Sequence, residues 1–101
     1  MKDQINEIIK FINDKFGEEK RSYESHELPK YFKIVMTVWE QKSVYAFIAK
    51  SDFENKKLGA VNKGDIFKAD GWTTPAKHSR GKLFDQTTWT CLEQYGPCYL
   101  R

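Results

Sequence analysis

Residues 31–49, YFKIVMTVWEQKSVYAFIA, decide the fold class of this chain. Residues 31–39 alternate, because every second side chain is a large apolar one facing the same way. These inward-facing residues are Phe32, Ile34, Met36 and Val38. Residues 44–49 form a second β-rich run that is apolar on both faces, as is typical of a strand in the middle of a sheet. The polar spacer at residues 40–43 predicts that the two strands form an antiparallel hairpin.

The segment before this hairpin predicts one amphipathic helix, at residues 3–16. Its apolar residues follow the i, i+3, i+4, i+7 spacing and cover one side of the helix. They are Ile5, Ile8, Ile9, Ile12 and Phe16. Asp3 is a candidate N-cap, and Gly17 is a candidate left-handed residue after the last turn. Residues 18–29 are charged and have no clear period, so we expect an exposed connection there that ends at Pro29.

The segment after the hairpin predicts one more strand and two short helices. Residues 51–63 read as a loop, and residues 64–69 as a third strand. Thr74 as an N-cap followed by Pro75 favours one or two helical turns over residues 74–81. Asp85 is expected to cap a second short helix at residues 86–95. That helix is expected to be buried through Trp89, Leu92 and Tyr95 and to be followed by an extended segment, residues 98–101.

Together these elements predict a small α+β fold. A chain of 101 residues has the usual size of one domain, so we expect a single domain over residues 1–101. The N-terminal helix should pack on an antiparallel sheet of three or more strands within a core formed by residues 31–101. The C-terminal third should contribute the short helices. Aromatic residues make up 15% of the chain, enough to build a real core in a small domain.

The positive charge of the chain is local. The net charge is +3, from 17 Lys and Arg against 14 Asp and Glu. Between residues 68 and 82 stand four cations and one histidine, against Asp70 alone. No apolar run approaches the ~18 residues that span a bilayer. The charged start does not resemble an export signal, so the expected location is the cytoplasm and the expected state of Cys91 and Cys98 is the reduced thiol.

Residues 72–82 are the candidate functional segment. The residues that could bind an anion or nucleic acid are Trp72, Lys77, His78, Arg80 and Lys82. Trp72 could stack on a base, the cations could neutralise phosphates, and a helix start at Pro75 would attract phosphate. A structural explanation competes with this one, because the ring could belong to the core and the cations could form a solvated face.

The sequence contains no recognisable catalytic or metal-binding signature. His26 and His78 stand outside any zinc-ligand spacing, and the two cysteines have no second pair nearby. A Cys–His pair with His78 and a divalent ion between Asp65 and Asp70 remain open alternatives without a local motif to support them. No glycine-rich nucleotide motif or nucleophile elbow is present. We therefore expect a protein that is not an enzyme and that needs neither a cofactor nor a metal.

Four sequence segments resemble a group of small tailed-bacteriophage proteins. They are KSVYAFI (42–48), GDIFK (64–68), WTTPAKHSRGKLFD (72–85) and YGPCYLR (95–101). The likeness covers residues 31–101 and leaves the N-terminal helix outside. At residues 69–71 the chain departs from the alanine-rich segment that usually leads into the tryptophan. The group has no assigned biochemical activity, so the resemblance implies a phage accessory protein that acts inside the infected bacterial host.

Three functions follow from these observations. The first is a non-enzymatic binding module for nucleic acid or another polyanion, acting through residues 72–82. The second is an inhibitor or adaptor that docks on a host or phage protein through the N-terminal helix or an open sheet edge. The third is a small enzyme or nucleotide-binding protein. The oligomeric state, and whether Cys91 and Cys98 pair, are left open by the sequence.

Overall fold

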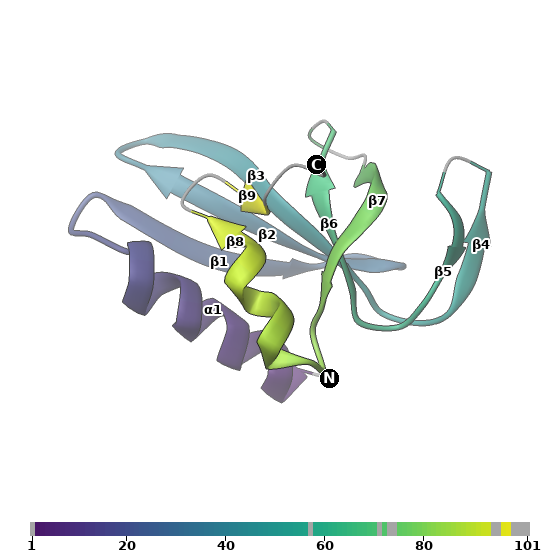
Figure 1. Cartoon of the computed structure of the whole chain (residues 1–101). Helices are drawn as coiled ribbons and strands as arrows, with labels where there is room; N and C mark the ends of the chain where they lie inside the picture. The colour runs from purple at the N-terminus through teal and green to yellow at the C-terminus, as the bar shows by residue number, and fades with distance from the viewer. Residues whose placement is uncertain (1, 57, 71, 73–74, 94–95, 98–101) are drawn as a thin grey trace.

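The structure, a computed structural model of the chain, describes residues 2–56, 58–70, 72, 75–93 and 96–97 (Figure 1). It contains an N-terminal helix followed mainly by antiparallel strands, so the expected α+β fold is confirmed. In chain order the elements are α1 (Lys2–Phe16), β1 (Arg21–Glu27), β2 (Tyr31–Val38), β3 (Gln41–Ala49), β4 (Phe53–Asn55), β5 (Gly59–Val61), β6 (Asp65–Ala69), β7 (Pro75–Lys82), the 3₁₀ helix η1 (Gln86–Cys91), β8 (Leu92–Glu93) and β9 (Gly96–Pro97).

The main sheet has five strands in the order β1-β2-β3-β6-β7, and each neighbouring pair is antiparallel. β2 and β3 are the predicted hairpin, and β6 is the predicted third strand. The turn is tighter than expected, because β3 already begins at Gln41 and only Trp39 and Glu40 connect the strands. Trp39, predicted as the last residue of the strand, instead has a left-handed φ of 57° in this turn.

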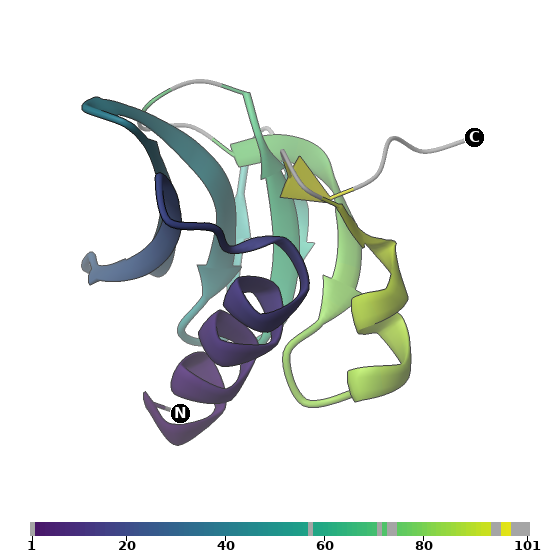
Figure 2. The same cartoon turned by 90° about the vertical axis from the view of Figure 1, so that its left-hand side faces the viewer.

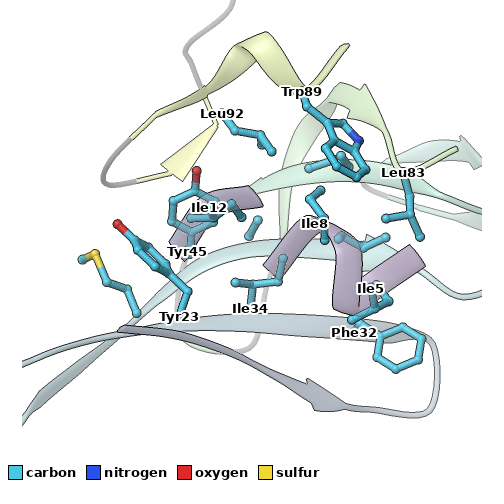
Figure 3. Packing of buried hydrophobic residues seen from close by; sticks show 14 residues of the cluster. Ile5, Ile8, Ile12, Tyr23, Phe32, Ile34, Tyr45, Leu83, Trp89 and Leu92 are labelled. Carbon is cyan, nitrogen blue, oxygen red and sulfur yellow. The ribbon is translucent and has the colours of Figure 1, made fainter. Parts of the chain in front are cut away.

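α1 packs its apolar side on one face of the sheet, as predicted. Ile5, Ile8 and Ile12 are at most 1% exposed. η1 covers the same face beside the helix (Figure 2) and brings Trp89 into the core (Figure 3). The Phe11 and Trp89 rings lie 5.4 Å apart. The strands and the C-terminal segment contribute the rest of this core: Tyr23, Phe32, Ile34, Met36, Tyr45, Ala46, Ile48, Ile66, Leu83, Trp89 and Leu92.

A second, smaller core lies on the opposite face of the sheet. Its buried members are Phe47, Ala49, Val61 and Phe67. The β4–β5 hairpin contributes to this core, with Phe53 directly opposite Val61. Residues 51–63 were expected to form a loop, and that expectation is wrong. Each of the two strands has only three residues, which is too short to show a period in the sequence.

β1 was also missed, because residues 18–29 were expected to form an exposed connection. The strand pairs with β2 along its whole length, yet Tyr23 is its only buried residue. The outer edge of β1 is closed at its centre by α1. The Tyr23 N–H donates to Asn13 Oδ1 at 3.0 Å, and Asn13 Nδ2 donates to the Tyr23 carbonyl at 3.1 Å. At this point the Asn13 amide makes the two hydrogen bonds that a neighbouring strand would otherwise make with the β1 backbone.

The C-terminal third contains less helix than expected. The helical turns predicted over residues 74–81 are wrong, because Pro75–Lys82 form the edge strand β7. An edge strand tolerates proline, which has no N–H to donate. The predicted second helix is only the short 3₁₀ helix η1, capped by Asp85 as expected, with Thr87 N–H donating to Asp85 Oδ1. Trp89 and Leu92 are buried as predicted. Tyr95 and residues 98–101 lie outside the described part of the chain.

Both ends of α1 differ in detail from the prediction. The helix already begins at Lys2, so Asp3 lies in its first turn and is not the N-cap. Gly17 does not adopt a left-handed φ. A Cβ atom at Gly17 would lie 2.4 Å from the Asn13 carbonyl oxygen, so glycine is needed for space. No helix in the described part of the chain combines the length and apolar character needed to cross a bilayer.

Candidate nucleic-acid interface

Trp72 follows β6 and presents its indole ring at the surface, with 53% of the residue exposed. The ring lies over the side chain of Lys33 in β2, with Lys33 Nζ 4.1 Å from the ring centroid. The same ammonium group donates a hydrogen bond of 3.3 Å to the Trp72 carbonyl oxygen. Both the ring and the backbone of Trp72 are therefore held by one lysine. The hypothesis that Trp72 is a core residue does not fit this exposure.

Lys33 is buried although it carries a charge, with only 8% of the residue exposed. In the sheet it stands between His26 of β1 and Phe47 of β3. Phe47 belongs to the second core, so Lys33 points to the face away from α1. Among the described residues it forms no ion pair. Removing a charge from water is costly, and the Trp72 ring and carbonyl are the groups that offset this cost.

Open space lies beside the Trp72 ring. A depression of about 410 Å³ runs between the start of β3 and the end of β6. It is lined by Lys42, Ser43, Val44, Ala69, Asp70 and Trp72. Lys42 Nζ lies 3.6 Å from Glu24 Oε1, in an exposed ion pair. Such pairs contribute little to stability, so a ligand anion could compete with Glu24 for this ammonium group.

The other predicted site residues fall on β7. The Lys82 ammonium contacts the carboxylate of Asp65, which is only 5% exposed. This pairing neutralises the charge that Lys82 was expected to offer to a phosphate. The backbone of β7 carries Lys77, His78 and Arg80, whose side chains lie outside the described part. The helix start that was expected near Pro75 to attract a phosphate does not form, because the segment is a strand.

Alternative chemistries find little support in the described residues. Asp65 was one of two carboxylates considered for a divalent ion, but its Oδ2 accepts from the Asn62 N–H at 2.9 Å and its Oδ1 contacts Lys82. Within the described ranges no group of three His, Cys, Asp or Glu residues is arranged to hold a metal. His26 Nε2 lies 3.3 Å from Glu24 Oε1 at the surface. The side chains of Cys91 and Cys98 are outside the described part.

One surface carboxylate has a clear structural role. Glu27 lies 2.7 Å from Lys50 Nζ and 3.5 Å from Lys2 Nζ, so it links β1 to the end of β3 and to α1. The hydrogen bond and charge of Lys50 lower the pKa of the Glu27 carboxyl below its ordinary value. On the second core, burial alone raises the pKa of the Tyr31 hydroxyl. Neither group lines the depression beside Trp72.

Two functional candidates were missed at the level of the sequence. Lys33 was expected only on the face of the strand opposite Phe32 and Ile34, where nothing in the sequence marked it as a site residue. Its ammonium group contacts the ring and the carbonyl of Trp72, which is 39 residues away. Lys42 was treated as part of a hairpin spacer. In both cases the only available signal was a lysine within a β-rich region, which is common at sheet surfaces.

Comparison with known proteins places the chain in a family but does not add a function. No curated protein and no solved structure matches it. The family match covers residues 1–96. It therefore includes α1, which the resemblance to the phage group had left outside. The chain belongs to the family described as "Family of unknown function (DUF7717)".

Proposed function

We propose that this chain is a non-enzymatic nucleic-acid-binding protein in which the Trp72 ring stacks on a base. The observation that carries the proposal is the exposed indole held in place by the buried Lys33. Stacking of a base on an aromatic ring contributes about 1–3 kcal/mol. An exposed ring that is already fixed loses little conformational freedom when a ligand binds, which favours affinity.

Cations near Trp72 would supply the contacts to phosphate. Lys42 lines the depression beside the ring, and β7 carries Lys77 and Arg80. Lys33 itself places a positive charge behind the ring. Lys82 contributes less than the sequence suggested, because its charge is matched by Asp65. The resemblance of residues 31–101 to small tailed-bacteriophage proteins supports the further proposal that this is a phage accessory protein in the cytoplasm of the infected bacterium.

The test is a direct binding measurement. Fluorescence anisotropy of labelled oligonucleotides should show binding to the wild-type chain that weakens as salt is raised. Trp72→Ala should lower the affinity by about 1–3 kcal/mol. Because the ring is half exposed, the same change should lower the free energy of unfolding by about 1–2 kcal/mol, less than the loss of a buried tryptophan. Lys77→Ala and Arg80→Ala should each reduce the salt slope by about 0.7 if the ligand is single-stranded.

Phe84→Ala is the matched control for Trp72→Ala. Phe84 is 52% exposed and has Lys63 Nζ 6.0 Å from its ring centroid, but it lies just beyond the other end of β7. It should leave nucleic-acid affinity unchanged. Equal losses for the two variants, or a wild-type chain that binds no oligonucleotide, would contradict the proposal.

The second candidate is a protein-interaction factor, favoured by one observation. β7 ends the main sheet, so a partner strand could add to it. The alternative route through α1 is weaker, because the apolar side of that helix packs inside this molecule. Three results together would favour this function. The chain would bind no oligonucleotide, it would bind one polypeptide, and substitutions in β7 would abolish that binding.

A further inference from the structure

Trp39 is the most exposed of the large apolar residues in the described part, at 70%. It is the first of two residues in the β2–β3 turn and has a φ of 57°. A left-handed φ is strained for a bulky side chain, and glycine or asparagine is preferred at such positions. Neither core nor turn geometry therefore accounts for tryptophan here. Strained residues are concentrated at binding and catalytic sites, which makes this turn a candidate site.

The surroundings of Trp39 resemble those of Trp72. Lys20 Nζ lies 5.1 Å from the Trp39 ring centroid, and the Trp39 N–H donates to the Lys20 carbonyl at 2.8 Å. A depression of about 720 Å³ is lined by Lys20, Val38, Trp39, Glu40 and Gln41. An exposed indole with a lysine against it and open space beside it thus occurs twice on this molecule. An aromatic platform next to a cation fits a base followed by its phosphate.

The residues that line the two depressions are neighbours in sequence at the start of β3. The one beside Trp39 reaches Gln41, and the one beside Trp72 begins at Lys42. Val38 in the first depression packs against the core under α1, whereas Val44 in the second packs against the core on the opposite face. A ligand that contacts both rings must therefore bend round the end of the β2–β3 hairpin. A duplex is stiff over about 150 base pairs and keeps its bases paired and stacked. A single strand bends freely and exposes its bases.

We infer that Trp39 is a second stacking platform and that the ligand is a single-stranded nucleic acid passing from Trp72 round the hairpin end to Trp39. This inference rests on the proposed function, because it names the class of nucleic acid that the Trp72 site would take. Lys20 and Lys42 would contact the phosphates between and beside the two bases. Paired bases cannot reach either ring, so duplex should bind more weakly than single strand.

The experiment uses the full chain and a labelled oligo(dT) probe. Trp39→Gly removes the ring and suits the left-handed backbone, so its melting temperature should equal or exceed that of the wild type. Its affinity for the probe should fall by about 5- to 150-fold, the loss expected for one stacked base. Trp39→Asn, which also tolerates this φ, should behave in the same way. Trp39→Phe keeps an aromatic ring and should retain most of the affinity.

The outcomes separate this inference from the proposed function. If the wild-type chain binds no oligonucleotide, both fail. If Trp72→Ala weakens binding while Trp39→Gly and Trp39→Asn bind like the wild type, the inference fails and the proposed function stands. The same holds if duplex of equal length competes as well as oligo(dT). Loss of affinity in both Trp39→Gly and Trp39→Asn at unchanged melting temperature, with weak competition by duplex, supports a single-stranded ligand.

Discussion

The buried Lys33 holds the exposed Trp72 in place. A lysine in a sheet interior is normally a source of instability, because its charge is removed from water without a carboxylate beside it. Here the ammonium group lies 4.1 Å from the indole centroid and bonds to the Trp72 carbonyl. The cation–π contact is worth about 2 kcal/mol when desolvated. The Lys33 charge thus fixes the Trp72 ring, and its burial lowers the free energy of unfolding.

This pair yields a prediction in which stability and binding change in opposite directions. Lys33→Met should leave the free energy of unfolding unchanged or raise it by up to about 1–4 kcal/mol, since a buried charge is replaced by an apolar side chain of similar length. Urea denaturation measures this. Oligonucleotide affinity should fall, because the ring loses its support. Lys10→Met, at an exposed lysine of α1 away from both rings, controls for the loss of one positive charge. A clearly destabilised Lys33→Met would show instead that the lysine maintains the fold.

Gly17 allows a prediction about space at the end of α1. Gly17→Ala should lower the free energy of unfolding by about 1–3 kcal/mol, because its Cβ would lie 2.4 Å from the backbone oxygen of Asn13. Gly59→Asn is the control, since that site has a φ of 76° and no atom within 4 Å of an added Cβ. Asparagine tolerates this backbone, so the control should change stability by less than about 1 kcal/mol. Equal melting temperatures for the two variants would contradict the crowding at Gly17.

At the scale of the element, α1 offers a matched pair of isoleucines. Ile12 is fully buried in the main core, whereas Ile9 packs against it and is only partly buried. Ile12→Ala should therefore cost about 2–5 kcal/mol, and Ile9→Ala clearly less, with the same change in helix propensity. Chemical denaturation of the two variants measures the difference. Losses below about 0.5 kcal/mol for both would mean that the helix does not pack on the sheet.

The elements that could be predicted from the sequence are those with long, periodic burial. α1 has a full apolar side, and β2 and β3 have continuous buried runs. β1 buries one residue in seven, so its sequence looks like a polar connection. The sequence Thr74-Pro75 resembled a helix start, but the pairing of Pro75–Lys82 with β6 overrides this local preference. Strands at an edge are shaped by their neighbour, and that information is not local.

The candidate site was predictable only in part, for the same reason. Trp72 stood out because a large aromatic lies close to several cations. Lys33 and the Trp39 turn did not, since one depends on a contact across 39 residues and the other on a turn of two residues instead of four. The expected cation cluster also changes on folding, because Lys82 meets Asp65. The residue types in a sequence show which charged and aromatic groups are present, but only the structure shows which of these groups are already paired with one another.

At the scale of the whole molecule, several ion pairs in the described part link different elements. Glu24 lies near His26 and Lys42, and Glu27 near Lys2 and Lys50. A net charge of +3 therefore gives only weak attraction at a distance. Any nucleic-acid affinity must come chiefly from close contact at the rings. Binding should accordingly persist at salt concentrations that abolish purely electrostatic binding.

Because Asn13 belongs to α1 and bonds to the backbone of the edge strand β1, the helix covers part of an edge that could otherwise pair with another molecule. While α1 is docked, the centre of the β1 edge is already hydrogen-bonded. If the helix detaches and the sheet remains folded, the β1 edge loses the Asn13 amide from its centre, and an uncovered edge can pair with a strand from another chain. Detachment of α1 in one molecule can then lead to association of two molecules through β1. Damage to α1 should thus appear first as concentration-dependent aggregation, before any loss of the sheet itself.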